Sequence, residues 1–243
     1  MSALLRSELL KLRTTRTFAA LVGSAAALSL LVVCLATALT DNVTEADLRD
    51  FFTADFTALF ILLLGVMGMA GEWRHRTITS TILAAPDRHR LVAAKLLAYV
   101  IAGTLMSLVV TLTIMAVGSA ILSARDEATL GIRELADVLW RNLALAGFSA
   151  AIGVCVGGLV RNQVAAIVGL LVFSFALEPT LLALAPDVGK FGPTSGAPVG
   201  IQGTGFDDDE DVLAPGAAAL VLLAWVAAGA VATALTLRRR DVL

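Results

Sequence analysis

Apolar and polar positions alternate along this chain in long blocks rather than residue by residue. Six stretches of about twenty residues contain at most one charged side chain each. A helix of that length crosses roughly 30 Å of hydrocarbon. The stretches cover about 18–39, 51–71, 96–122, 138–160, 163–185 and 214–237. This pattern predicts an all-α polytopic membrane protein with six transmembrane helices, which form a single transmembrane domain over residues 1–243.

Composition and charge exclude a soluble globular enzyme and set an orientation. Hydrophobic residues make up 58% of the chain and charged residues 16%, against about 45–50% and about 25% in soluble domains. The net charge of −2 conceals a separation of the two signs. With the N-terminus inside, thirteen Lys and Arg residues flank the spans on the cytoplasmic side and five on the other. The positive-inside rule therefore predicts cytoplasmic N- and C-termini.

The residues before the first span predict a short basic amphipathic helix over 3–16. Its leucines recur at helical spacing, and its basic residues lie mostly on other faces. Such a helix is suited to lie in the cytoplasmic interface against anionic lipid of the bilayer. An anchor that only orients the first span is the simpler interpretation. The leucines are Leu5, Leu9 and Leu12, and the basic residues of this predicted interfacial helix include Lys11, Arg13 and Arg16.

The cytoplasmic stretch from Glu72 to Lys95 is too polar to span a membrane and too long for a turn. Its apolar positions share one helical face up to Pro86, which is expected to end that helix because the residue before a proline avoids the α region. Asp87 is well placed to cap the next helix, which continues into the third span. The sequence therefore predicts a short helix across the cytoplasmic mouth of the protein, although a plain linker is the alternative.

Two acidic residues fall inside predicted spans. Asp55 lies one turn into the second span, and Glu178 lies in the outer part of the fifth span, followed by Pro179. Ionisable residues within membranes are rare and often functional, so both are candidates for the pathway or for gating. For Glu178, the favoured interpretation is a structural contact with a neighbouring helix or a side chain that snorkels to the edge of the membrane.

Close packing is the expected role of the glycines in two of the spans. Gly153 and Gly157 form a GxxxG pattern in the fourth span, and Gly65, Gly68 and Gly71 recur in the second. Small residues let membrane helices approach one another closely.

Several kinds of chemistry are missing from the sequence. It contains no GxxxxGK[ST] phosphate-binding loop and no HExxH motif. The two histidines and two cysteines lack metal-ligand spacing, so no metal site is predicted. No groove of aromatic and basic residues suggests nucleic acid. We therefore expect a transport or scaffold protein that is not itself an enzyme and binds no cofactor.

Two segments resemble bacterial permease subunits of type-2 ABC exporters. The first is Ser7-Glu8-Leu9-Leu10-Lys11-Leu12-Arg13-Thr14-Thr15-Arg16. The second is Glu72-Trp73-Arg74-His75-Arg76-Thr77, followed by Pro86-x-Arg88 and Lys95. In that family a Glu closes the second span and precedes a Thr, a Pro-x-Arg turn and a Lys that enters the third span. The family often has Gly where this chain has Arg76.

The resemblance implies a permease in the bacterial cytoplasmic membrane that works with a separate ABC ATP-binding subunit. That subunit would bind ATP and Mg and hydrolyse the ATP. A second permease copy or a paralogue would complete a dimeric pathway. The 72–86 segment would be the coupling helix that docks on the ATPase, and the coupling residues carried over are Glu72, Arg76, Thr77, Pro86, Arg88 and Lys95.

Two alternatives from other classes stay open at this point. One is an ion-coupled carrier that uses Asp55 and Glu178, which would run on an ion gradient. The other is a multispan regulatory scaffold, which would transport nothing. The transported substrate does not follow from six apolar segments.

Overall fold

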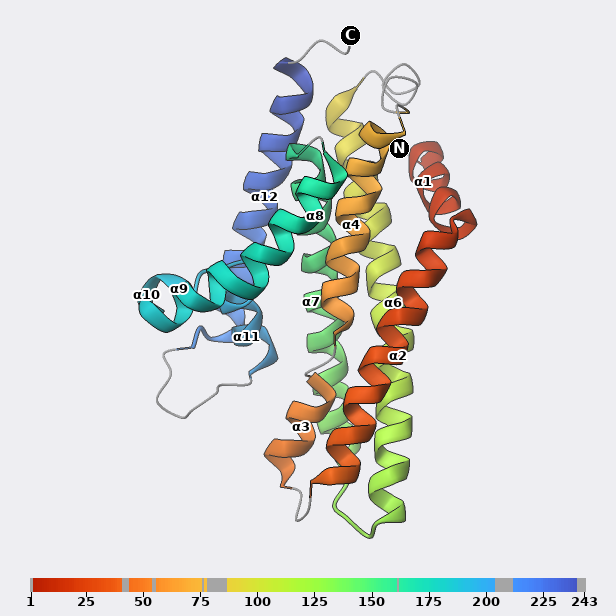
Figure 1. Ribbon diagram of the computed structural model, residues 1–243, viewed down its shortest axis with the longest axis vertical. Coiled ribbons are helices and arrows are strands. Elements are labelled where there is room, and N and C mark those ends of the chain that lie inside the picture. Colours follow the sequence, from red (N-terminus) through yellow and green to blue (C-terminus); the bar gives the residue numbers. More distant parts are fainter. Residues whose placement is uncertain are drawn as a thin grey trace.

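A computed structural model describes residues 2–40, 44–53, 56–75, 77, 87–160, 162–203 and 212–239 (Figure 1). These residues form helices and connecting turns, with no strand among them, which confirms the predicted all-α class. In chain order the elements are α1 (Ser2–Thr14), α2 (Arg16–Leu39), α3 (Glu45–Thr53), α4 (Thr57–Arg74), α6 (Arg88–Ala124), α7 (Ile132–Leu159), α8 (Gln163–Val172), the π-helical turn η1 (Phe173–Leu177), α9 (Glu178–Leu184), α10 (Pro186–Gly189), α11 (Gly196–Gln202) and α12 (Pro215–Arg239).

Six helical segments are long and apolar enough to cross a membrane, as the sequence predicts. The third, α6, has 37 residues and begins well before the predicted span. Asp87 caps it, because its carboxylate accepts hydrogen bonds from the backbone N–H groups of His89 and Arg90 at 3.1 and 3.3 Å. The predicted capping role of Asp87 is therefore confirmed, and α6 extends as one helix from the polar connection into the apolar layer.

The second predicted span, about 51–71, is divided between two helices rather than being one continuous helix. Thr53 ends α3, and α4 begins at Thr57 after Phe56, whose backbone is not helical. The backbone N–H of Phe56 donates instead to Ser29 Oγ of α2 at 3.3 Å. This contact satisfies a donor that the start of a helix leaves without an intrahelical partner.

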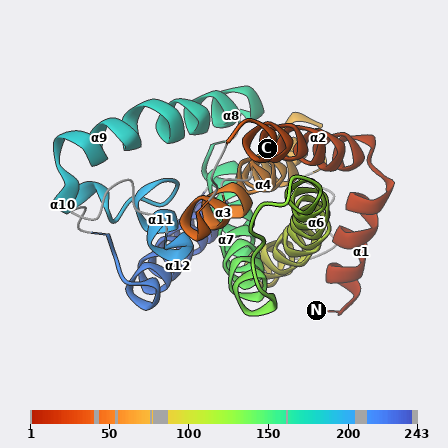
Figure 2. The ribbon, with the colours of Figure 1, turned by 90° about the horizontal axis from the view of Figure 1, so that it is seen from below.

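Helix α7 lies at the centre of the bundle, where it packs against α4, α6 and α12 (Figure 2). The contact with α4 is made through glycine. A Cβ at Gly153 would lie 2.2 Å from the Leu62 carbonyl oxygen, and a Cβ at Gly157 would lie 2.5 Å from that of Val66. From the opposite side, a Cβ at Gly65 would lie 2.6 Å from the Ala150 carbonyl oxygen. The two backbones therefore touch, as the sequence predicts for these glycines.

Replacing Gly153 with alanine is expected to destabilise the bundle. The added methyl group would meet the backbone of α4, which moves only if the two helices separate, and overpacking of this kind costs about 1–3 kcal/mol. We expect the melting temperature in detergent to fall by several degrees. Gly169→Ala is the matched control, because a Cβ there meets nothing within 4 Å. Equal melting temperatures for the two variants would contradict this packing.

The segment α8–η1–α9 leans away from the bundle and ends at α10, on the side opposite α1 (Figures 1 and 2). In its most apolar window only 11% of the residues are buried, against 61% for α7. The π-helical turn directly precedes Glu178 and Pro179. Proline cannot donate the usual helical hydrogen bond, and a π turn is one way for a helix to accommodate that loss.

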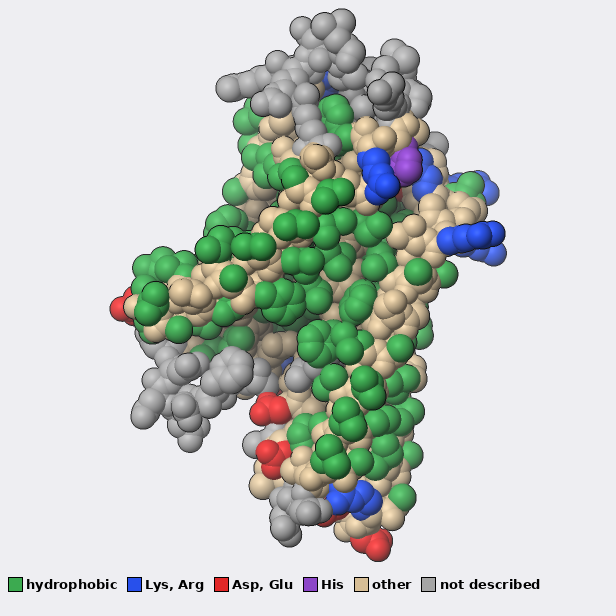
Figure 3. Space-filling view, in the orientation of Figure 1, with side chains coloured by type: hydrophobic (Ala, Val, Ile, Leu, Met, Phe, Trp, Pro, Cys, Tyr) green, Lys and Arg blue, Asp and Glu red, His purple; other side chains and the backbone are tan. Residues whose placement is uncertain are grey.

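The start of α1 and the end of α12 lie at the same end of the bundle (Figure 1). Leu12 of α1, Val92 of α6 and Leu237 of α12 belong to one buried apolar cluster there. In the view of Figure 3, Lys and Arg gather mainly at this end, whereas Asp and Glu lie toward the other end and beside α10. The separation of charge predicted along the sequence is thus also a separation in space.

Candidate functional site

Helix α1 packs its apolar side against the protein itself. Leu12 is buried, and Leu5 and Leu9 are partly buried against the same core cluster, which includes residues of α4 and α6. Glu8 shares this inward side and is 3% exposed, whereas Arg13 and Arg16 are exposed. The predicted N-terminal helix is therefore present, with an acidic side chain among its apolar contacts. Its position in the membrane interface stays a prediction.

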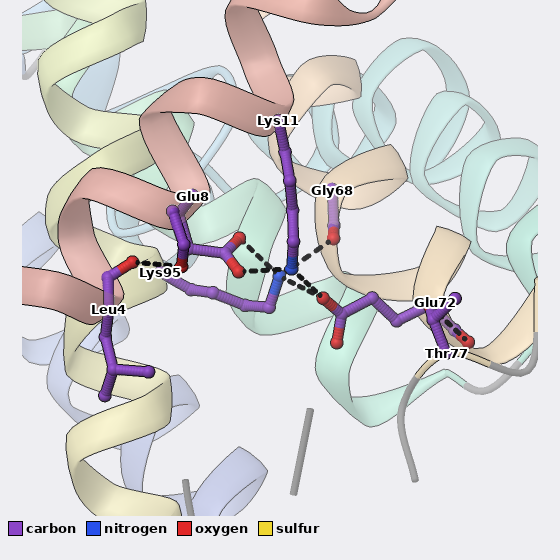
Figure 4. Close-up of polar contacts among 8 residues, drawn as sticks. Leu4, Glu8, Lys11, Gly68, Glu72, Thr77 and Lys95 are labelled. Carbon is purple, nitrogen blue, oxygen red and sulfur yellow. Dashed lines mark hydrogen bonds and ion pairs between the residues drawn. The ribbon is translucent and has the colours of Figure 1, made fainter. Parts of the chain in front are cut away.

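Four charged side chains meet where α1, the end of α4 and the start of α6 come together (Figure 4). We refer to Glu8, Lys11, Glu72 and Lys95 as the charge cluster. Lys95 Nζ lies 2.7 Å from Glu8 Oε2 and 2.8 Å from Glu72 Oε1. Lys11 Nζ lies 2.6 Å from Glu8 Oε1 and 3.1 Å from Glu72 Oε1. The cluster therefore links α4 and α6, the helices on either side of the 75–87 connection, to each other and to α1.

Burial makes the partners in this cluster dependent on one another. The side chain of Lys95 is 1% exposed, that of Glu8 3% and that of Glu72 8%, while that of Lys11 is 50% exposed. Taking a charge out of water costs several kcal/mol, which only well-placed opposite charges offset. Two acids and two bases leave no net charge in the cluster. Loss of any one member would leave an uncompensated charge.

Two further groups hold Lys95 in place. Its Nζ donates to the carbonyl oxygen of Gly68 at 3.3 Å and lies 5.9 Å from the centroid of the Tyr99 ring, within range of a cation–π contact. A Cβ at Gly68 would fall 2.0 Å from Cζ of Tyr99. Only glycine therefore lets α4 come this close to the ring, which covers the ammonium group.

The surroundings move the pKa values of the two cluster members in α1. Burial alone would raise the pKa of the Glu8 carboxyl, but the charge of Lys95 and hydrogen bonds from Lys11 and Lys95 lower it below its usual 4.5. Burial alone would lower the pKa of the Lys11 ammonium. The hydrogen bond to Glu8 and the charges of Glu72 and Glu8 instead raise it above its usual 10.5.

The attachment of α1 is expected to depend on pH in a defined direction. The stabilisation that Glu8 contributes is present above the pKa of its carboxyl in the unfolded chain and is lost as pH falls through the lower pKa of the folded state. The stabilisation that Lys11 contributes is lost as pH rises through the raised pKa of its ammonium in the folded state. The difference in melting temperature between the wild type and Glu8→Gln should therefore be largest between about pH 5 and about pH 10 and shrink in stronger acid. A difference that is unchanged at about pH 3 would contradict this assignment.

The structure brings together three residues that the sequence analysis singled out, namely Lys11, Glu72 and Lys95. Thr77 is exposed beside them, and its backbone N–H donates to the Glu72 carbonyl oxygen at 3.0 Å. Arg88 is partly buried as the first residue of α6. Arg76, Pro86 and most of the expected 72–86 helix lie outside the described residues.

Three members of the site were missed in the selection of candidate residues: Glu8, Gly68 and Tyr99. A signal for Glu8 was present, because it falls within the leucine spacing of the N-terminal helix and three residues before Lys11. An acid on an apolar helix face needs a partner when it is buried. Gly68 was expected only to pack closely, and Tyr99 carries no comparable signal, since their places beside Lys95 depend on how α4 and α6 cross.

Glu178 lies far from the charge cluster and is 1% exposed. Its carboxylate accepts backbone N–H bonds from Thr194 at 3.0 Å, Ser195 at 2.6 Å and Gly196 at 3.0 Å, and it also accepts the hydroxyl of Thr194. These contacts tie the segment before α11 to α9. They agree with the structural interpretation favoured from the sequence, and a gating role stays a prediction.

The candidate role of Asp55 in the pathway or in gating stays a prediction. Asp55 lies outside the described residues. Within the described ranges, His, Cys, Asp and Glu side chains form no group of three or more that could hold a metal ion.

Comparison with known proteins identifies the family of this chain. The sequence model of a family described as ABC-2 family transporter protein matches residues 4–177. The matched region contains α4, α6 and all but the first two residues of α1, and with them every member of the charge cluster. No curated protein matches the chain. Because the family match covers well over half of the sequence, the chain belongs to the ABC-2 family of transporter membrane proteins.

Proposed function

We propose that this chain is the permease subunit of an ATP-driven exporter and that it couples to a separate ATP-binding subunit through residues 72–90. The family supports the permease role. The charge cluster is the observation that carries the coupling role, because it fixes both ends of the 75–87 connection. Lys95 at the start of α6 pairs with Glu72 at the end of α4, and Glu8 joins α1 to both.

Because the charge cluster joins α4 to α6, a local displacement of the 75–87 connection would move whole helices. A partner that displaces the connection acts on α4 and α6 together, since their ends are joined by a buried ion pair of 2.8 Å. Switching transitions commonly move packed helices as units in this way. The movement of α4 and α6 would also reach α7, because α7 packs against both helices.

The proposal includes an orientation and a second membrane subunit. The end that holds the charge cluster is cytoplasmic, because Lys and Arg gather there (Figure 3). In their most apolar windows only 17% of α2, 11% of the α8–α9 segment and 22% of α12 are buried. These surfaces are available to lipid and to a second permease, either another copy or a paralogue.

Co-purification tests the proposal. The tagged chain, extracted from its native membrane in mild detergent, is expected to bring with it a soluble ATPase that has a phosphate-binding loop. Arg88→Glu should remove most of that ATPase, because it reverses a charge at the proposed contact.

Arg133→Glu is the matched control. Arg133 is exposed in the first turn of α7, at the other end of the bundle, and the same substitution there should leave the ATPase bound. An intact chain that brings no ATPase would contradict the proposal and return attention to an ion-coupled carrier. Equal loss in the two variants would contradict the assigned contact.

A further inference from the structure

A cavity of about 530 Å³ lies beside the charge cluster, lined by residues of α1, α2, α4, α6 and α8. Glu72, Lys11 and Gln163 contribute polar groups to its lining, while Phe18 and Leu64 contribute apolar ones. Leu64 precedes Glu72 by eight residues in the same helix. The lining therefore extends about 12 Å along α4, from the charged end of the helix toward its apolar middle.

Two buried oxygen atoms in this lining have no donor among the residues that the structure describes. Glu72 and Gln163 are 7% and 8% exposed, and both line the cavity. Oε2 of Glu72 and Oε1 of Gln163 accept no hydrogen bond from any residue that the structure describes. Figure 4 shows the Glu72 carboxylate engaged through one oxygen only. A buried acceptor without a donor is costly, so a ligand with more than one N–H group suits this lining.

Lys11 provides the opposite charge at the same cavity. Its ammonium group donates to Glu8 Oε1 and Glu72 Oε1, which leaves a third N–H, and its side chain is half-exposed. A phosphate placed beside Lys11 would accept that third N–H. The lining thus offers acceptors for an ammonium group, a donor for a phosphate and an apolar stretch.

We propose that this cavity binds a phospholipid whose headgroup carries a primary ammonium. The ammonium donates to Glu72 Oε2 and Gln163 Oε1, the phosphate lies beside Lys11, and an acyl chain follows Phe18 and Leu64. The apolar part of the lining favours a membrane lipid over a soluble amine. The inference uses the charge cluster of the proposed function, but it does not depend on an ATPase partner.

A series of headgroup methylations tests the site on the purified full-length chain alone. The chain is placed in bilayer discs with phosphatidylethanolamine, its monomethyl or dimethyl derivative, or phosphatidylcholine, and the lipid retained after extraction into detergent is measured by native mass spectrometry. We expect the monomethyl derivative, which keeps two N–H groups for the two acceptors, to be retained like phosphatidylethanolamine, and retention to fall for the dimethyl derivative and to be about tenfold less for phosphatidylcholine. That ratio corresponds to about 1.4 kcal/mol. Equal retention across the series would overturn the proposal.

Variants locate the contact. Gln163→Leu should reduce the preference to about threefold or less, whereas Gln163→Glu, which keeps the acceptor oxygens, should preserve it. Gln202→Leu makes the same change outside the cavity lining and should leave the preference unaltered. A preference that survives Gln163→Leu would overturn the assignment of the site. Displacement of the lipid by millimolar soluble phosphoethanolamine would overturn the choice of a lipid as the ligand.

Discussion

Replacing Lys95 with methionine is expected to have the largest effect on stability of any single substitution in the charge cluster. The variant leaves Glu8 and Glu72 buried, with only the half-exposed Lys11 to balance them. Breaking a buried ion pair by removing one partner costs about 3–5 kcal/mol. We expect a sharp fall in folded protein recovered from the membrane and a lower melting temperature in detergent.

A second substitution separates lost charge balance from lost packing. Glu8→Gln combined with Lys95→Met removes one acid and one base, so that the pair Lys11–Glu72, 3.1 Å apart, remains balanced. The double variant should therefore be more stable than Lys95→Met alone, which is the non-additivity expected of residues in contact. Additive losses would contradict the view that the four side chains act as one electrostatic unit.

Glu178→Leu is expected to produce the second large loss of stability, on the side of the molecule opposite α1. The carboxylate accepts three backbone N–H groups, those of the partly buried Thr194 and Ser195 and of the buried Gly196, and leucine would leave all three without it. A buried donor left unpaired costs about 1–3 kcal/mol, and the two partly buried donors add to that cost. The segment from Lys190 to Gly203 should become sensitive to protease, which limited digestion measures.

Two further variants distinguish this structural role from a carrier's proton site. Glu178→Gln retains an oxygen acceptor and should be far more stable than Glu178→Leu. If Glu178 were the proton site of an ion-coupled carrier, neither glutamine nor leucine could take up and release a proton there. Glu178→Gln and Glu178→Leu would then lose transport equally while both remained folded. Asp187→Asn changes an exposed carboxylate on the adjacent helix α10 and should have little effect.

The spans could be predicted from the sequence because their cause is local. An uncharged run of about twenty residues has few stable environments other than a bilayer. The cap at Asp87 is local as well, since a carboxylate one residue before a helix meets the first free N–H groups. The glycines of the fourth span were also predictable as packing residues, although the sequence does not show that α4 is their partner.

The site was harder to predict because it joins residues far apart in the chain. The ion pair between Glu8 and Lys95 links positions 87 residues apart, and the choice of partner depends on how α1 lies across α6. The partners of Glu178 come from a connection of glycines and prolines that shows no helical period. The direction in which α8–η1–α9 diverges from the bundle is likewise set by the packing of the folded chain rather than by hydropathy.

Photocrosslinking from Thr77 tests most directly the claim that this permease is driven through residues 72–90. A photoreactive amino acid at exposed Thr77 should form an adduct with the ATP-binding subunit in native membranes. The same amino acid at Ile132, which is 86% exposed at the opposite end of the bundle, should form none. An ATPase adduct from position 132, or none from position 77 in a preparation where an ATPase co-purifies, would contradict the account.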